Sequence, residues 1–291
     1  MRELNSVPRL ARPKDRPELE ELWACSFHDD PARIRNFLHF MAQDDRTVVL
    51  EENGNVVAAA YLLPCRIGLS GSFYPAYCLS AAATLPDYRN RGCMSRIIRY
   101  CKDLGAERGK DFLLAVPPEN DLYRFFSQFG FRPCLTQKTL RCSRDQLAET
   151  VASLASPELS GAPEPDRTVI RQTAFAGLPF VDWDRAALKY IFFEHTWSGG
   201  KSILSADGYA LYKKSGTTAT VTELCAGSDP AALTGPLLRT GAEDFVLCLP
   251  AGSPAAGKRC QTGRAGMAVP LTKTGKTLQR QLKDLYIGFT L

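Results

Sequence analysis

The chain has 291 residues, of which 45% are hydrophobic, and it carries a formal net charge of +5 at pH 7. This length predicts a globular protein of one large or two ordinary domains. No apolar run is long enough to span a bilayer, and the N-terminus lacks the apolar stretch of a signal peptide, so we expect a cytoplasmic protein with no membrane partner. Because the arginines are spread along the chain, we do not expect nucleic acid as a partner. An anionic cofactor would account for a local cluster of arginines.

The ten cysteines are scattered through predicted strands and helices. Their spacings match neither a disulfide framework nor a zinc site. We therefore expect reduced, mostly buried thiols and no bound metal.

The first half of the chain alternates between predicted strands and helices. Asn53-Gly54 between two apolar runs predicts a hairpin. The continuous apolar run 112–116 is typical of a central strand covered on both faces, and Pro117-Pro118 end it. Strands are predicted over 7–11, 47–51, 56–67, 77–85, 112–116 and 131–142, with helices over 16–27, 31–41, from Gly92 onward, and in a short segment that Gly130 closes.

The composition shifts to Ser, Ala, Pro and Glu over residues 143–168, which predicts a short helix followed by a linker. A second set of elements follows this segment. Helices are predicted over 184–197, 230–239 and 276–285, and strands over 202–212, 218–224 and 245–249.

Residues 82–94 run from an apolar strand into a basic, glycine-containing turn that opens a helix. The first N–H groups of a helix have no intrahelical partner, and the helix dipole adds partial positive charge, so such a turn can hold a phosphate. Gly92 lets the backbone come close, while Arg89 and Arg91 add charge. The alternative is an ordinary helix start with solvated arginines; the strand-turn-helix context favours the phosphate cradle.

This turn resembles the acyl-CoA-binding signature of the GNAT N-acetyltransferase superfamily. The matching residues are Arg89, Asn90, Arg91, Gly92, Cys93 and Met94, with Met94 standing where the family usually has a small residue. Thr84-Leu85-Pro86 and Gly130-Phe131 match the strand end and the helix end of that fold. The resemblance implies an α/β (α+β) fold with a mixed, largely antiparallel sheet flanked by helices. It also implies acetyl-CoA as co-substrate, with its pantetheine arm pairing near Ala83 and Thr84 and with no metal.

The second half resembles the cofactor-free half of tandem acetyltransferases related to the enhanced-intracellular-survival acetyltransferases. The resemblance is carried by Trp183-Asp184, Glu194-His195, Gly199-Gly200, Gly208-Tyr209-Ala210 and Gly266-Met267. It implies a GNAT domain over 1–142, a linker over 143–168, and a degenerate GNAT-like domain over 169–291 that walls the acceptor site.

The general acid is where the sequence departs most from the family. The family usually places a tyrosine four residues before the helix-closing glycine, beside the CoA sulfur, and here that cofactor-contacting position is Phe126. A phenyl ring cannot donate a proton. Tyr123 lies on nearly the same helix face and is the substitute candidate, although a packing role beside Phe125 and Phe129 is favoured.

Three further groups are candidates for acid-base or nucleophilic work. His28 is a candidate general base because histidine is the residue type suited to proton transfer near neutral pH, but the favoured alternative leaves it solvated while Asp29 caps the next helix. Cys93 stands at a helix N-terminus, where thiol pKa values fall, yet direct transfer needs no acyl-enzyme. By resemblance to the tandem enzymes, the terminal carboxylate of Leu291 is a candidate acid-base group.

The sequence therefore predicts an acetyl-CoA-dependent N-acetyltransferase acting on a small-molecule or peptide amine by direct attack on the thioester. Phe126 and Met94 motivate the alternative of an inactive CoA-binding regulatory or scaffold protein. A third hypothesis makes the second half a carrier of an apolar ligand in a closed apolar cavity.

Overall fold

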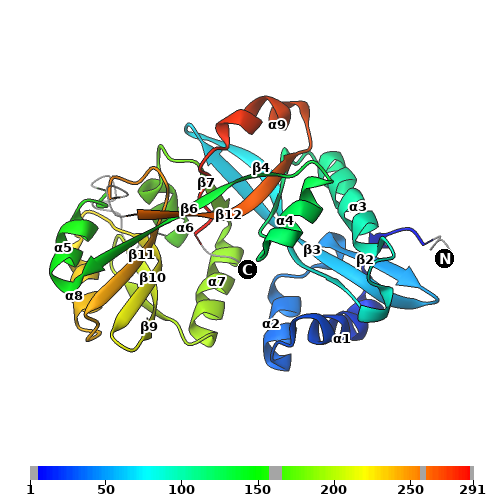
Figure 1. The fold of residues 1–291 in the computed structure, drawn as a ribbon, viewed down its shortest axis with the longest axis horizontal. Helices are drawn as coiled ribbons and strands as arrows, with labels where there is room; N and C mark the ends of the chain where they lie inside the picture. Colours follow the sequence, from blue (N-terminus) through cyan, green and yellow to red (C-terminus); the bar gives the residue numbers. More distant parts are fainter. Residues whose placement is uncertain (1–5, 157–165, 256–259, 289–291) are drawn as a thin grey trace. The chain divides into compact units, whose positions relative to one another are not determined.

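The computed structural model describes residues 6–156, 166–255 and 260–288. The chain forms two compact units, each assembled from separate stretches of sequence (Figure 1). Unit 1 comprises Met1–Cys65, Pro75–Arg132 and Met267–Gln279, and unit 2 comprises Arg66–Tyr74, Pro133–Gly266 and Arg280–Leu291. These units are not the contiguous ranges 1–142 and 169–291 of the predicted domains, because residues 267–279 return to the first unit and 133–142 join the second.

Unit 1 is built on a mixed sheet in the strand order β1-β2-β3-β4-β5-β12. The pairs β1/β2, β2/β3 and β5/β12 are antiparallel, whereas β4/β5 is parallel. The strands are β1 (Arg9–Leu10), β2 (Thr47–Glu52), β3 (Asn55–Leu69), β4 (Ser72–Thr84), β5 (Phe112–Ala115) and β12 (Cys260–Pro270). The helices are α1 (Arg16–Phe27), α2 (Pro31–Phe40), α3 (Cys93–Glu107), α4 (Asn120–Ser127) and α9 (Lys273–Leu278).

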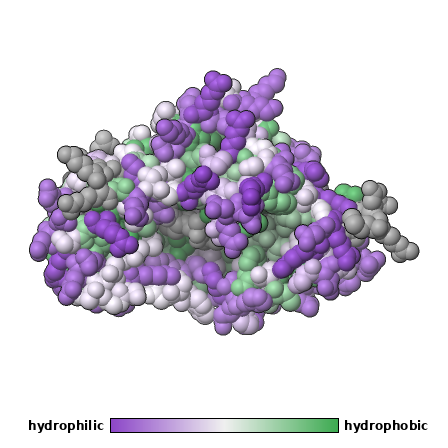
Figure 2. All heavy atoms as spheres, viewed as in Figure 1, coloured by the Kyte–Doolittle hydropathy of each residue, from purple (hydrophilic) through white to green (hydrophobic). Residues whose placement is uncertain are grey.

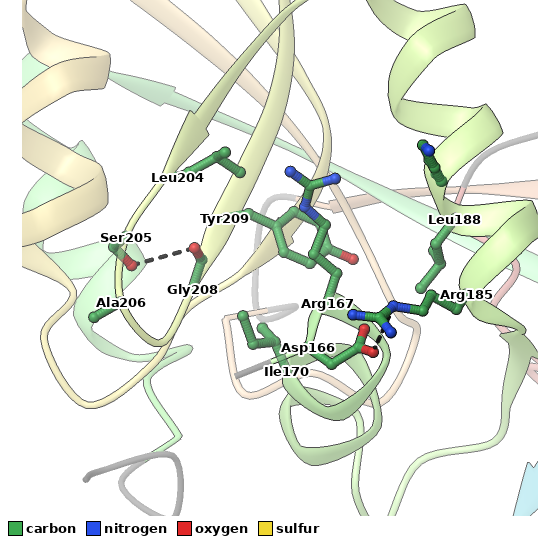
Figure 3. A pocket seen from close by; sticks show the side chains of 11 residues that line it. Asp166, Arg167, Ile170, Arg185, Leu188, Leu204, Ser205, Ala206, Gly208 and Tyr209 are labelled. Atoms are coloured by element: carbon green, nitrogen blue, oxygen red, sulfur yellow. Dashed lines mark hydrogen bonds and ion pairs between the residues drawn. The ribbon is translucent and has the colours of Figure 1, made fainter. Parts of the chain in front are cut away.

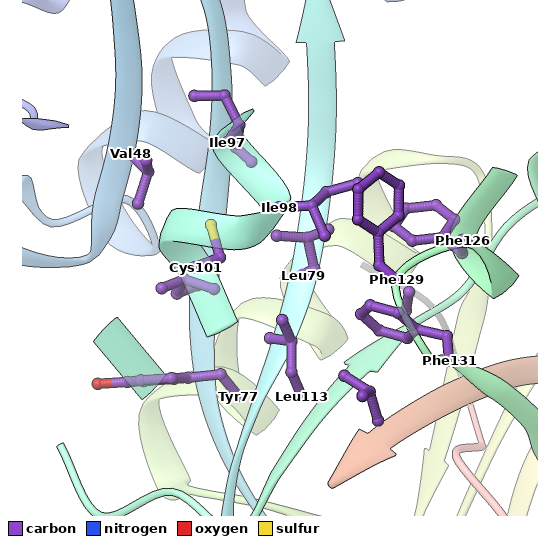
Figure 4. Packing of buried hydrophobic residues seen from close by; sticks show 14 of the residues in the cluster. Val48, Tyr77, Leu79, Ile97, Ile98, Cys101, Leu113, Phe126, Phe129 and Phe131 are labelled. Atoms are coloured by element: carbon purple, nitrogen blue, oxygen red, sulfur yellow. The ribbon is translucent and has the colours of Figure 1, made fainter. Parts of the chain in front are cut away.

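Both faces of this sheet are covered, which explains the long apolar run of β3. On one face, Tyr61 contacts Trp23 of α1 and Phe37 of α2, with ring centroids 5.6 and 5.3 Å away. Its neighbours Ala60 and Leu62 belong to the core on the other face, because successive strand residues point to opposite sides. Figure 4 shows that second core, in which α3, β4, β5 and the aromatic residues around α4 supply the side chains.

Unit 2 contains the strand order β6-β11-β10-β9-β8. The β10/β11 pair is parallel, and the other three pairs are antiparallel. The strands of this unit are β6 (Arg132–Ser143), β7 (Phe180–Trp183), β8 (Lys201–Leu204), β9 (Tyr209–Ser215), β10 (Thr218–Cys225) and β11 (Asp244–Leu249). The helices are α5 (Arg144–Ala152), α6 (Arg167–Ala174), α7 (Arg185–Trp197) and α8 (Ala231–Leu238).

An ion pair lies inside unit 2 with no exposure to solvent. Arg171 of α6 and Glu223 of β10 are both fully buried, with Nε 3.1 Å from Oε1. Arg171 also donates to the carbonyls of Val181 and Ile287, and the Tyr209 hydroxyl donates to Glu223. Burial is the largest effect and opposes the positive charge, but the interactions with Glu223, Tyr209 and Cys225 together raise the pKa of Arg171. This network joins α6, β7, β10 and the segment before the C-terminus.

Several predicted elements differ from the structure. The predicted strand 202–212 is two strands, because residues 205–208 form a turn in which Ser205 N–H donates to the Gly208 carbonyl. The predicted final helix 276–285 is correct only in its first part. α9 spans Lys273–Leu278 and a 3-10 helix follows over Gln279–Gln281, whereas Leu285 and Tyr286 form parallel bridges with Leu135 and Phe180. Strands β7 and β12 and helix α6 have no counterpart in the predicted elements. β7 and α6 are short, and β12 contains two glycines.

The thiols are mostly buried, as the sequence predicts: Cys65, Cys78, Cys93, Cys101, Cys142 and Cys225 are buried, and Cys25 is exposed. Hydrophilic side chains cover much of the face drawn in Figure 2, with hydrophobic residues scattered among them. Among the described residues, no helix is both long enough and apolar enough to cross a membrane.

His195 gives the stability of unit 2 a predicted pH dependence. Its Nε2 lies 3.2 Å from the Lys201 carbonyl and 3.1 Å from the Tyr212 carbonyl, and burial lowers its pKa below the ordinary 6.5. Because the unfolded chain then binds the proton more tightly, stability should be full above pH 6.5 and should fall as the pH drops below it. Urea unfolding at pH 7.5 and about pH 5.5 measures this. His195→Gln should reduce the difference, whereas His28→Gln, an exposed control, should not.

Candidate functional site

The turn before α3 has an unusual backbone. Asn90 and Gly92 both adopt left-handed conformations, with φ of 60° and 76°, and α3 begins at Cys93. Gly92 is the N-cap and supplies no side-chain hydrogen bond, and the first turn of α3 contains no acidic residue. The first N–H groups of α3 therefore have no capping side chain, which is the condition an anion-binding helix start requires.

Positive charge surrounds this helix start. Arg89, Arg91 and Gly92 are all exposed to solvent. Arg89 Nε donates to the Thr84 carbonyl at 3.1 Å, so this side chain ties the turn to the end of β4. The Arg91 guanidinium lies 5.4 Å from the centre of the Tyr88 ring. Arg91 is thus the cation of the turn that the described hydrogen bonds leave available for a ligand.

Strands β4 and β5 separate beside the turn. Their parallel pairing ends at Leu79 opposite Ala115, and β4 continues to Thr84. β5 stops there because Pro117 and Pro118 follow, and proline has no N–H to donate. Within the part of β4 that extends past β5, Ala81 has φ of 44°, a strained value for a residue with a side chain. The prolines signalled the strand end in the sequence, but nothing there signalled the strained alanine.

Ala83 and Thr84, predicted to face the cofactor arm, lie in this extended end of β4. Ala83 is buried and Thr84 is partly buried, and the Leu85 N–H donates to the Val57 carbonyl on the β3 side. The strand end at Thr84 and the following turn agree with the predicted motif.

Tyr123 and Phe126 lie on the same buried face of α4, as predicted. They are 9% and 7% exposed and belong to one hydrophobic core with Cys93 of α3, and Met94 packs against that core. Figure 4 shows Phe126 among the aromatic residues Phe129 and Phe131. α4 ends before Gly130, whose φ is 86°, in agreement with the predicted helix end. The core therefore connects the α4 aromatic residues with the first turn of α3.

Cys93 has the environment of a packing residue. Its Sγ lies 3.4 Å from the Tyr88 carbonyl, and the residue is 2% exposed. Burial raises the pKa of the Cys93 thiol despite the neighbouring arginines. A raised pKa disfavours the thiolate, so the structure supports the alternative in which Cys93 is not a nucleophile.

His28 is exposed at the end of α1, where its φ is 56°. The predicted helix cap is wrong by one residue: Asp30, not Asp29, accepts the N–H groups of Ala32 and Arg33. Asp29 instead accepts from Trp23 Nε1 at 2.9 Å and pairs with Arg33. Asp29 therefore contacts side chains of α1 and α2 and not the α2 backbone, which residue type alone could not show.

Leu291 lies outside the described residues. Within those residues, no group of three or more His, Cys, Asp or Glu side chains is arranged to hold a metal ion.

Residues 7–134 match the family model of the acetyltransferase (GNAT) domain. No curated protein sequence is significantly similar to the chain.

Solved structures of similar fold cover most of the chain. A GCN5-related N-acetyltransferase from Anabaena variabilis matches with a TM-score of 0.71 and 13% identity, over 93% of this chain and 74% of that one. One from Kribbella flavida matches with a TM-score of 0.68 and 18% identity, over 92% and 72%. Eis1 from Mycobacterium abscessus matches with a TM-score of 0.67 and 17% identity, over 91% and 73%. Residues 7–134 therefore match the GNAT acetyltransferase domain, and the fold of most of the chain is similar to that of Eis1 and of the two GCN5-related N-acetyltransferases.

Proposed function

We propose that the chain transfers the acetyl group of acetyl-CoA to a primary amine by direct attack of the amine on the thioester. The observation that carries this proposal is the start of α3, where uncapped N–H groups, two left-handed residues and exposed Arg89 and Arg91 come together. Left-handed residues beside a helix start turn successive N–H groups toward one point, a geometry that suits the pyrophosphate of CoA.

The extended end of β4 supports the proposed binding of the pantetheine arm of CoA. Residues 80–84 run past the last pair with β5, so the pantetheine amides can bond to the backbone near Ala83 and Thr84 as an added strand would. The strained backbone at Ala81 lies in the same stretch. A backbone N–H there would polarise the thioester carbonyl as negative charge develops on it.

The acid-base groups of the proposed reaction are Tyr123, His28 and the terminal carboxylate of Leu291. Tyr123 lies in the same core as Phe126. Its hydroxyl can therefore donate a proton to the leaving thiolate only if the CoA sulfur reaches the α4 face of that core. His28 is exposed and would accept a proton from the incoming amine. The carboxylate follows a segment that the buried Arg171 holds through the Ile287 carbonyl.

A titration with acetyl-CoA tests the proposal directly. Calorimetry on the purified chain, followed by a free-thiol assay over a panel of small-molecule and peptide amines, should show saturable binding and amine-dependent thiol release. Absence of acetyl-CoA binding would overturn the proposal.

The second candidate function is a CoA-binding protein that has lost catalysis. It is favoured by Phe126, which fills the usual position of the general acid with a buried ring. This candidate predicts acetyl-CoA binding without thiol release for any amine.

The terminal carboxylate has its own test. Deleting Thr290 and Leu291 should abolish turnover and leave the affinity for acetyl-CoA unchanged, because the deletion moves the terminal carboxylate back by two residues, to Phe289, without touching the α3 turn. Turnover by amine titration and affinity by calorimetry separate the two effects. Adding one glycine after Leu291 moves the carboxylate in the opposite direction and should likewise lower turnover without changing the affinity. Full turnover in the truncated chain would exclude this group.

We further propose that the chain is a cytoplasmic tandem enzyme, in which unit 1 contains the GNAT domain and unit 2 is a degenerate GNAT-like domain. The acceptor is a small molecule or a peptide amine.

A further inference from the structure

Unit 2 contains a cavity of about 750 Å³ at the N-termini of α6 and α7. This volume is within the range of small-molecule binding sites. Figure 3 shows Asp166, Arg167 and Arg185 grouped on one side of the cavity, facing Leu204, Ser205 and Gly208 of the β8–β9 turn on the other.

The residues that line this cavity carry more positive than negative charges. Arg167, Arg185 and Lys189 are cations, and Asp166 is the acidic residue of the lining. Asp166 accepts the Thr168 N–H and pairs with Arg185 Nε at 3.1 Å; the Thr168 bond, followed by the charges of Arg185 and Arg167, lowers the pKa of Asp166. Among the described residues, neither Arg167 nor Lys189 forms an ion pair. Two positive charges are therefore left without a matching carboxylate.

The walls around these charges are ordered by packing. The Arg167 guanidinium lies 4.2 Å from the centre of the Phe192 ring, a cation–π distance that fixes its orientation. Tyr209 is fully buried, and its hydroxyl donates to Glu223 in the buried ion pair. Buried Ile170 and Leu188 supply an apolar surface in the same cavity. A ligand would meet the Arg167 guanidinium, which packs on Phe192, beside an apolar wall.

We propose that this cavity binds a small organic dianion, a phosphate monoester or a dicarboxylate with an apolar body. Arg167, Arg185 and Lys189 hold the charged group, and Ile170 and Leu188 contact the apolar body. A guanidinium recognises carboxylate and phosphate with paired N–H donors, which suits both sources. The lining contradicts a purely apolar cargo, the third hypothesis drawn from the sequence, because four charged residues face the cavity.

Calorimetric titration at pH 8 and low salt with phenyl phosphate, phthalate and phenol tests the proposal. Phenyl phosphate is fully dianionic at this pH, and phenol is its uncharged counterpart. At least one dianion should bind saturably and phenol should not. Binding of phenyl phosphate alone identifies a phosphate site, and binding of phthalate extends it to dicarboxylates. No binding of either dianion, or equal binding of phenol, would overturn the proposal.

Variants locate the binding within unit 2. Arg167→Gln and Lys189→Gln should each weaken dianion binding about tenfold, the effect expected for one charge-assisted hydrogen bond. Lys213→Gln removes the same charge from an exposed position of β9 outside the cavity and should have no effect. Arg91→Glu alters the α3 turn of unit 1, the other anion site, and should also leave dianion binding unchanged.

The test of dianion binding in unit 2 does not depend on the proposed acetyl-CoA site. Acetyl-CoA affinity should be the same in Arg167→Gln, Lys189→Gln and the wild-type chain. Dianion binding that survives in both cavity variants, or disappears in Arg91→Glu, would place it elsewhere and overturn the proposal.

Discussion

Arg171→Met should destabilise unit 2 by about 3–5 kcal/mol, the loss typical of a buried ion pair that loses one partner. Arg171 and Glu223 are both fully buried, so the substitution leaves a carboxylate without its countercharge inside the protein. It also removes the donors to the Val181 and Ile287 carbonyls. Urea unfolding followed by far-UV circular dichroism measures the loss as a shift in the midpoint.

Two controls separate charge burial from a general effect of losing an arginine. Arg124→Met removes the same side chain from an ion pair with Asp121 in which both partners are 80% exposed, so it should cost less than about 1 kcal/mol. The double variant Arg171→Met with Glu223→Leu removes both charges and should recover most of the stability lost in the single variant. Equal losses in the single and double variants would contradict the role of the unpaired carboxylate.

Arg91→Glu should weaken acetyl-CoA binding by at least about tenfold, because it replaces an attractive charge at the α3 helix start by a repulsive one. Arg91 is exposed and, unlike Arg89, makes no hydrogen bond to the end of β4. Calorimetric titration with acetyl-CoA at two salt concentrations measures the effect, and the difference between variant and wild type should shrink at high salt.

The matched control is Arg99→Glu, which makes the same charge change further along α3. Arg99 is exposed and lies 5.6 Å from the Phe129 ring, away from the first turn of the helix. Its effect on affinity should be small, because the field of the helix end falls off within the first turn. If Arg99→Glu weakened binding as much as Arg91→Glu, net charge rather than the turn would explain the affinity.

The local sequence was sufficient to predict most of the helices, strands and turns of unit 1. Helix α1 occupies the predicted range 16–27, and β2 and β3 flank the predicted Asn53-Gly54 turn. Gly92 and Gly130 adopt the left-handed backbone that the predicted turns require. These features depend on capping, on turn residues and on the spacing of apolar residues, all of which act over a few neighbours.

The sequence by itself determined the strand, turn and helix that make the candidate cofactor site, because that site is one continuous stretch around Arg89 to Met94. Only the tertiary structure decided three other features: the end of β4 that extends past β5, the Arg171–Glu223 pair, and the cavity between α6, α7 and the β8–β9 turn. Each brings together residues far apart in the chain. Burial and countercharge are properties of that assembly, so no local pattern could encode that Glu223 in a strand meets Arg171 from a helix 52 residues earlier.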